Sequence, residues 1–188
     1  SALNEHELRQ GAERILAQLG DSTSTASRSS DERKRFYSNI LLDPAIDSVL
    51  AKPLGEDDGF LDEIAQMAPE FVELLRNKVW TSRSLERVTD ESLRDAFNGL
   101  SPAQKTALML AFPPEASDRL QSFMPEGTGR TIALDQLRRA RERGDNTETE
   151  SATRLAREFL DYLRRQAEEG KITLREVTET PAPESQAA

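Results

Sequence analysis

Few side chains in this sequence could perform chemistry, and they do not gather at catalytic spacing. The single histidine, His6, has no acidic, cysteine or second histidine partner at metal-ligand spacing, so we interpret it as a surface residue. The loop Gly127–Arg130 could hold an anion on its backbone amides, but it lacks the lysine and the spacing of a phosphate-binding loop. The acidic pairs Asp57-Asp58 and Glu168-Glu169 are chain neighbours, which predicts solvated charge instead of a positioned acid and base. The sequence therefore predicts no enzyme and no catalytic, cofactor-binding or metal-binding residue.

Charged residues that could bind a protein partner are more numerous. The candidates are Glu115, Arg119, Arg130, Arg138, Arg139 and Arg141. The last three belong to a basic run within a helix predicted over 131–143, where Ile132, Leu134 and Leu137 are the apolar anchors. This run could meet an acidic face of a partner, or it could be the exposed side of a charged helix, and the second interpretation is the simpler one.

The overall charge limits the kinds of partner. The chain of 188 residues has a net charge of −9 and a pI near 4.8, which opposes general binding to nucleic acid because that affinity comes from neutralising phosphates. The absence of cysteine excludes disulfides and thiolate metal sites, and it fits a reducing, cytoplasmic setting. No apolar run has the length of a membrane span, and no N-terminal segment has the pattern of a secretion signal. We expect protein partners, no nucleic acid and no membrane insertion.

The strongest periodic pattern predicts an amphipathic helix from Glu150 to Glu169, about 30 Å long at the α-helical rise. Gly170 is expected to end it, and Lys171–Leu174 is expected to be extended. Shorter helices with serine, threonine or aspartate caps and proline at the first position fill most of the preceding chain. The sequence therefore predicts an all-α fold of stacked helical hairpins that ends in one long amphipathic helix.

Two local features define expected boundaries within this fold. Asp31 is expected to cap a helix through Leu42, and Asp43-Pro44 is expected to start a separate one, because aspartate followed by proline is a typical helix start. The segment 144–148 is polar and expected to be loose. Trp80, the sole tryptophan, lies where two helical units join, and core packing is the favoured interpretation over ligand stacking.

Composition divides the chain into five segments. They are an N-terminal helix (1–20), a flexible linker (21–30), a middle helical subdomain (31–82), a C-terminal helical subdomain (83–178) and a disordered tail (179–188). The linker is rich in serine and threonine, so the first helix is expected to be free to dock on a partner or on a neighbouring copy.

Two stretches of the sequence are similar to a known family. The end of the chain, Leu163-Arg164-Arg165-Gln166-Ala167-Glu168-Glu169-Gly170-Lys171-Ile172-Thr173-Leu174, resembles the closing helix and short apolar exit of the flagellar motor switch protein FliG family. The stretch Leu75–Leu93, which contains Asn77-Lys78-Val79-Trp80, resembles the segment that joins the middle and C-terminal domains of that family. Weaker similarity covers Gly11–Leu16 and the turn Asn98–Ser101.

The resemblance implies an armadillo-like superhelix in the rotor ring of the flagellum. It implies a non-enzymatic assembly protein without a cofactor, located at the cytoplasmic face of the membrane, whose partners are rotor or membrane-ring proteins and further copies of itself. It also implies a hinge at Val79, Trp80, Thr81 and Ser82, where the family has methionine-phenylalanine-x-phenylalanine and this chain retains one aromatic residue.

The sequence departs from the family at the surface that meets the stator. A basic residue of the family falls on Glu115, and its two consecutive acids fall on Ser122 and Phe123. The remaining arginine corresponds to Arg130 or to Glu148, depending on whether 131–144 is an insertion. The Glu-His-Pro-Gln motif that contacts the next rotor protein is absent, and the middle region is shorter. The resemblance therefore implies a divergent member whose retained role is assembly.

Two other functional classes stay open. The first is a helical adaptor of another complex, or a regulatory module like the N-domain of magnesium transporters, in which acidic surface clusters would bind magnesium. The second is a small enzyme, for which no catalytic constellation is visible.

Overall fold

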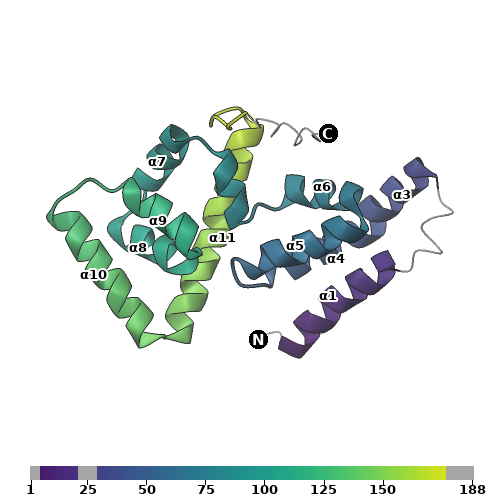
Figure 1. Ribbon diagram of the computed structural model, residues 1–188, viewed down its shortest axis with the longest axis horizontal. Coiled ribbons are helices and arrows are strands. Elements are labelled where there is room, and N and C mark those ends of the chain that lie inside the picture. Colours follow the sequence, from purple (N-terminus) through teal and green to yellow (C-terminus); the bar gives the residue numbers. More distant parts are fainter. Residues whose placement is uncertain (1–4, 21–28, 177–188) are drawn as a thin grey trace, which may run out of the picture.

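The computed structural model describes residues 5–20 and 29–176, with side chains from Gln10 onward in the first range. The described chain is all-α, as the sequence predicts, and its helices pack against one another (Figure 1). In order they are α1 (Glu5–Gly20), α3 (Ser30–Phe36), the π-helical turn η1 (Tyr37–Leu41), α4 (Leu42–Leu50), α5 (Glu56–Met67), α6 (Pro69–Lys78), the 3-10 helix η2 (Ser82–Arg87), α7 (Asp90–Asn98), α8 (Pro102–Ala111), α9 (Pro114–Ser122), α10 (Thr128–Arg143) and α11 (Asn146–Glu168).

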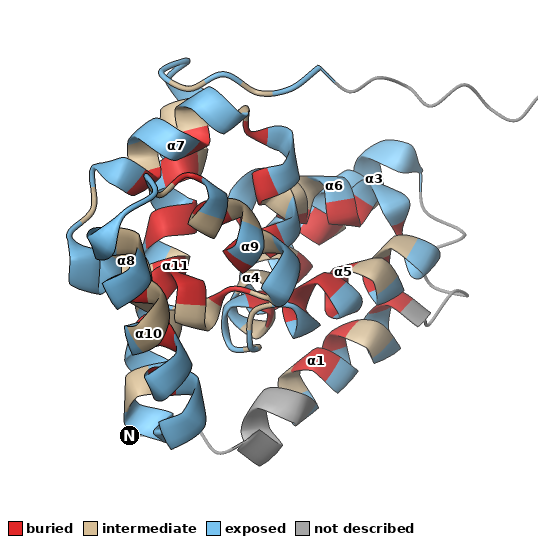
Figure 2. Ribbon diagram, turned by 60° about the vertical axis from the view of Figure 1, so that its left-hand side comes forward, coloured by how far each residue is buried: buried red, intermediate tan, exposed pale blue. Residues whose placement is uncertain are grey.

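The buried apolar side chains form two clusters that divide between Val79 and Trp80. One cluster includes Ile15, Ile64 and Phe71 and is built by α1 to α6, which we call the first helical unit. The other is built from Trp80 onward by η2 to α11, which we call the second helical unit. Figure 2 shows the buried residues on the inward faces of the helices of both units. Each unit therefore has an apolar core of its own.

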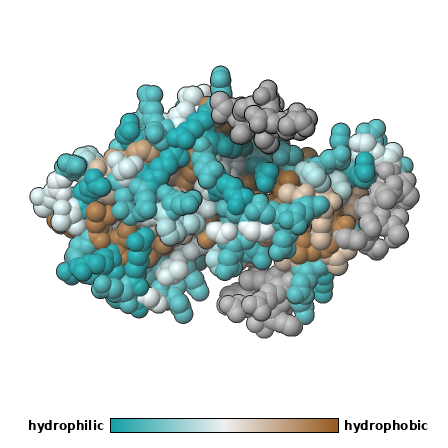
Figure 3. All heavy atoms as spheres, viewed as in Figure 1, coloured by the Kyte–Doolittle hydropathy of each residue, from teal (hydrophilic) through white to brown (hydrophobic). Residues whose placement is uncertain are grey.

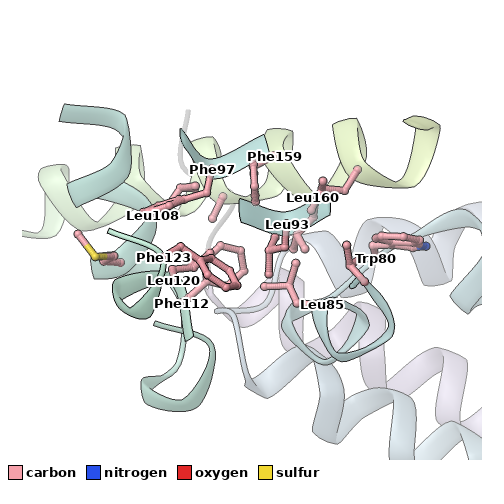
Figure 4. Close-up of a cluster of buried hydrophobic side chains, with 14 of the residues drawn as sticks. Trp80, Leu85, Leu93, Phe97, Leu108, Phe112, Leu120, Phe123, Phe159 and Leu160 are labelled. Carbon is pink, nitrogen blue, oxygen red and sulfur yellow. The ribbon is translucent and has the colours of Figure 1, made fainter. Parts of the chain in front are cut away.

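Helix α11 organises the second helical unit. It lies across the middle of the molecule, with α7 to α10 on one side and the first helical unit on the other (Figure 1). Its inward stripe contains Ala156, Phe159, Leu160 and Leu163, all buried. Phe159 and Leu160 meet Phe97, Leu108 and Leu93 of α7 and α8 in the same cluster (Figure 4). Trp80 is buried at the edge of this cluster, so the prediction that it packs in the core is confirmed.

The start of α11 corrects the expectation of a loose segment over 144–148. Gly144 has a φ of 57°, the left-handed conformation that ends α10 without a side-chain clash. Asp145 then caps α11, because its carboxylate accepts hydrogen bonds from the backbone N–H groups of Thr147 (2.8 Å) and Glu148 (3.4 Å). The polar residues are thus the first turn of the long helix.

The expected helix start at Asp43-Pro44 is also wrong. Residues Ser30–Leu50 form one helical path, and Pro44 lies inside α4. The π-helical turn at Tyr37–Leu41 accounts for this, because there Leu42 N–H bonds to the carbonyl of Tyr37, five residues back. Proline has no backbone N–H and its ring clashes with the carbonyl four residues back in a regular helix. The wider π-helical turn just before Pro44 removes the need for that regular hydrogen bond.

Helix α1 packs on its own chain. Ala12, Ile15 and Leu19 are buried in the core of the first helical unit, where α1 lies against α4 and α5. The expectation that this helix is available for a partner or a neighbouring copy is therefore not what the structure shows. His6 lies in α1, but its side chain is outside the described part of the structure. Most of the linker over 21–30 and the tail over 179–188 also lie outside the described residues.

The segment after α11 is extended as predicted, but it forms only an isolated bridge. Leu174 pairs with Val88 in antiparallel fashion, Thr89 N–H donates to the carbonyl of Thr173 (3.1 Å), and Arg175 N–H donates to the carbonyl of Arg87 (2.6 Å). These bonds fix the exit of α11 against the segment that precedes α7.

Candidate functional site

The four residues of the implied hinge, Val79–Ser82, form the connection between the two helical units, which we call the joint. All four are buried. Helix α6 ends at Lys78 because Val79 turns into the extended conformation. The joint is also fixed locally, since the backbone N–H of Thr81 donates to Ser84 Oγ at 2.9 Å in a capping box that starts η2.

Asp58 of α5 binds the joint from the side of the first helical unit. One of its carboxylate oxygens accepts from Thr81 Oγ1 at 2.5 Å, and the other accepts from Ser82 Oγ at 3.1 Å. Asp58 is buried, so these hydrogen bonds replace the water that its charge would otherwise need. The two hydroxyls that follow the end of α6 are therefore hydrogen-bond donors to a buried carboxylate of α5.

Asp57, the preceding residue, binds the second helical unit through α11. Its Oδ2 forms an ion pair with Arg157 Nη1 at 2.7 Å, and its Oδ1 accepts from the backbone N–H groups of Gly55 (2.9 Å) and Asp58 (2.8 Å). Arg157 Nη2 reaches further into the first helical unit, where it donates to the carbonyls of Lys52 (2.6 Å) and Val49 (3.2 Å). One arginine of α11 therefore holds three acceptors of the first helical unit.

The expectation that Asp57 and Asp58 are solvated is wrong. The side chain of Asp57 is fully inaccessible and that of Arg157 is 11% exposed. Burial raises the pKa of Asp57 above its ordinary value of 3.8, and the attraction of Arg157 acts in the opposite direction without cancelling the effect. With both of its oxygens bonded and no contact with solvent, Asp57 is placed for structure and not for proton transfer to a substrate.

Sequence reasoning missed Arg157 and both aspartates for a physical reason. Arg157 lies on the polar side of the helical pattern of α11, beside Arg154 and Glu158, and nothing in the pattern distinguishes it from these exposed neighbours. Its partner is 100 positions away in the chain. The local signal in the sequence is a pair of consecutive carboxylates two and three residues after Gly55. In the structure, the φ of 100° at Gly55 lets the loop before α5 present its amide to Asp57.

Glu115 and Arg119 lie beside a surface cleft next to the joint. The cleft has a volume of about 420 Å³, and Gly55, Asp58, Ser82 and Arg83 also line it. Arg119 is bonded internally, since it donates to the carbonyls of Leu85 (2.5 Å) and Val88 (2.7 Å) and pairs with Asp90 at 2.7 Å. Glu115 is exposed in the first turn of α9. Of these two candidates, Glu115 alone presents an accessible charge to a partner.

The other four candidates lie on α10 and do not join this cleft. Arg138 and Arg139 are exposed and pair with Asp135 on the same helix, at 2.6 and 2.9 Å. Arg141 is directed toward the carbonyl of Met109 and Ser117 Oγ, both at 3.4 Å. Arg130 is half-buried near the start of the helix. The structure thus distributes the six candidates over two surfaces.

A shallow groove lies between α9 and α10, beside two of these arginines. Arg138 and Arg141 border it, Leu134 and Leu137 form its apolar part, and its volume is about 490 Å³. Figure 3 shows apolar atoms on this side of the molecule around α8 and α10, and a second apolar area near α4 and α5.

No protein-family model matches the chain, and no curated protein matches it significantly. Within residues 5–20 and 29–176, no group of three histidine, cysteine or carboxylate side chains is arranged to hold a metal ion. In the same described ranges, no helix has both the length and the apolar character needed to cross a bilayer.

Proposed function

We propose that the protein is a non-enzymatic assembly scaffold of the flagellar rotor type, a divergent armadillo-like relative of the motor switch protein FliG. The observation that carries the proposal is the spatial relation of the two stretches with the most specific resemblance. Leu75–Leu93 contains the joint and η2, and Leu163–Leu174 contains the end of α11. The bridge between Val88 and Leu174 brings these two stretches together. The two stretches therefore lie side by side in the fold, which supports the proposal.

The charge distribution supports an assembly role without the charge pattern of a torque surface. Glu115 is exposed at the position where the family has a basic residue, and Phe123 is buried where it has an acid. An electrostatic contact between rotor and stator depends on the sign of the charges, so this surface does not reproduce the family's contact. What the chain keeps is the stacked helices and the joint that sets their mutual orientation.

Basal bodies extracted with detergent from the source cells test the proposal. We expect the protein to co-purify with the rotor and membrane-ring components, and we expect deletion of its gene to reduce the number of assembled rotors. Complementation with Glu115→Arg should restore assembly and leave swimming speed unchanged, because the proposed role does not use this charge. A protein absent from basal bodies, with rotor assembly normal in the deletion strain, would exclude the scaffold function.

A further inference from the structure

An apolar groove lies between α7 and α11, on a part of the surface that the proposed function does not use. Its volume is about 330 Å³, and its apolar walls are Ala96, Leu100, Leu155, Phe159 and Tyr162. Tyr162 is 46% exposed although it belongs to a helix whose other aromatic residue, Phe159, is buried. A half-exposed aromatic side chain beside a groove is typical of a surface that anchors a partner.

Two carboxylates border this groove, one on each helix. Asp95 of α7 and Glu158 of α11 line it together with the apolar residues, and both are exposed. Within the described residues, neither forms an ion pair. Among the cations on neighbouring turns, Arg94 lies over the ring of Phe123 (5.2 Å), Lys105 lies over the ring of Phe97 (5.6 Å), and Arg154 is exposed one turn before Glu158 on α11. The edges of the groove therefore carry two exposed carboxylates that a cationic partner could reach.

We propose that this groove docks a cationic amphipathic helix of a partner protein. Large apolar side chains of such a helix, at intervals of three and four residues, would enter the groove and contact Leu100, Leu155 and Tyr162. Lysine or arginine residues beside them would meet Asp95 and Glu158. The net charge of −9 favours the approach of a cationic segment and disfavours an acidic peptide or an anionic membrane surface. This inference is independent of the proposed rotor function.

The probe is a fluorescent helical peptide made of leucine on one face and lysine on the other. A companion peptide in which glutamate replaces lysine has the same apolar face. We expect saturable binding of the lysine peptide to the full chain and no binding of the glutamate peptide. Amide chemical-shift changes should concentrate in α7 and α11, which would locate the binding site without any substitution.

Two variants with matched controls separate the groove from general attraction by net charge. Tyr162→Ala should weaken binding at least roughly tenfold, because exposed aromatic anchors dominate such interfaces. Its control is Ile40→Ala, which removes a 56% exposed apolar side chain from the first helical unit.

The double variant Asp95→Lys, Glu158→Lys should also weaken binding roughly tenfold and should reduce the salt dependence of binding. Its control, Glu63→Lys with Glu70→Lys, changes the net charge equally at exposed positions of α5 and α6.

Three outcomes would overturn the proposal. The first is lysine-peptide binding that both double variants weaken equally, because this would show attraction by net charge alone. The second is the absence of saturable binding or of shift changes in α7 and α11. The third is a dimer of the free chain, seen by sedimentation, that Tyr162→Ala converts to a monomer, because a second copy would then occupy the groove.

Discussion

Two ion pairs of nearly equal length lie in opposite surroundings. Arg157 and Asp57 at the joint are 2.7 Å apart, with side chains 11% and 0% exposed, whereas Arg138 and Asp135 on α10 are 2.6 Å apart, with side chains 68% and 36% exposed. Both are arginine and aspartate on helices, and neither stands out in the sequence. Solvent screens the pair on α10, while the pair at the joint interacts in a medium of low polarity, where an unpaired partner is costly. Burial, not distance, therefore decides what each pair contributes.

Removal of the buried carboxylate should have the largest effect. Asp57→Ala leaves the guanidinium of Arg157 buried without its counter-charge, and we expect the free energy of unfolding to fall by about 3–5 kcal/mol. Chemical denaturation monitored by circular dichroism measures this change. Asp62→Ala is the matched control, because Asp62 is also on α5 and pairs with an arginine, Arg83, at 2.7 Å, but both side chains are about half exposed. That control should lose no more than about 1 kcal/mol. Equal losses in the two variants would contradict the importance of burial.

Replacement of both partners at the joint should be less harmful than removal of one. Asp57→Leu with Arg157→Met leaves no buried charge without a partner, so we expect its loss of stability to be smaller than that of Asp57→Ala. The double-mutant cycle, completed with both single variants, gives the coupling energy of the pair. A loss equal to the sum of the single variants would mean that the two side chains do not interact.

Arg119 represents an intermediate case. Its guanidinium has a side-chain exposure of 21%, and it bonds to the carbonyls of Leu85 and Val88 as well as to Asp90. Arg119→Ala leaves these two carbonyls and the Asp90 carboxylate without their hydrogen-bond donor, so we expect the free energy of unfolding to fall by about 1–3 kcal/mol. Arg94→Ala is the control, because Arg94 lies over the same Phe123 ring. We expect this variant to lower the free energy of unfolding by about 0.5–1 kcal/mol. Thermal unfolding of both variants ranks them, and a larger effect at Arg94 would reverse the expected order.

The sequence predicted the helices better than the charged contacts between them. Periodic apolar residues in α11 and the proline and serine caps of α8 depend on neighbours within a few positions, so local patterns reveal them. Pro44 was misinterpreted because the π-helical turn before it, which accommodates the proline, has no sequence signature that we recognised. The partner of Arg157 is a carboxylate 100 positions away, and only the tertiary fold brings them together. Charge in the sequence does not distinguish Arg119, which is bonded internally, from Arg138, which faces solvent.

Two of the aspartates bonded to arginine, Asp57 and Asp90, should respond to pH in opposite directions. Burial raises the pKa of Asp57, so the folded chain binds this proton more tightly, and the contribution of Asp57 to stability decreases as pH rises through its folded-state pKa. The hydrogen bond from Arg119 lowers the pKa of Asp90, so its contribution is present above the ordinary value of 3.8 and is lost as pH falls through the folded-state pKa. The free energy of unfolding is measured as a function of pH for the wild type, Asp57→Asn and Asp90→Asn. The difference between wild type and each variant, plotted against pH, should have slopes of opposite sign in the acidic range. Slopes of the same sign would contradict the assignment for Asp57.

The exposed pair on α10 should show the smallest effect. Arg138→Ala removes an ion pair within one turn of a helix, where solvent screens the attraction and a second arginine, Arg139, also binds Asp135. We expect the smallest loss of stability among these variants, which alanine's better helix propensity further reduces. Denaturation at low and high salt measures it, and the small difference from wild type should vanish at high salt. The pair at the joint should keep its effect under the same conditions, because salt does not reach a buried carboxylate. A stability difference between wild type and Arg138→Ala that persists at high salt would show that solvent does not screen this pair. It would contradict the conclusion that burial distinguishes the pair at the joint from the pair on α10.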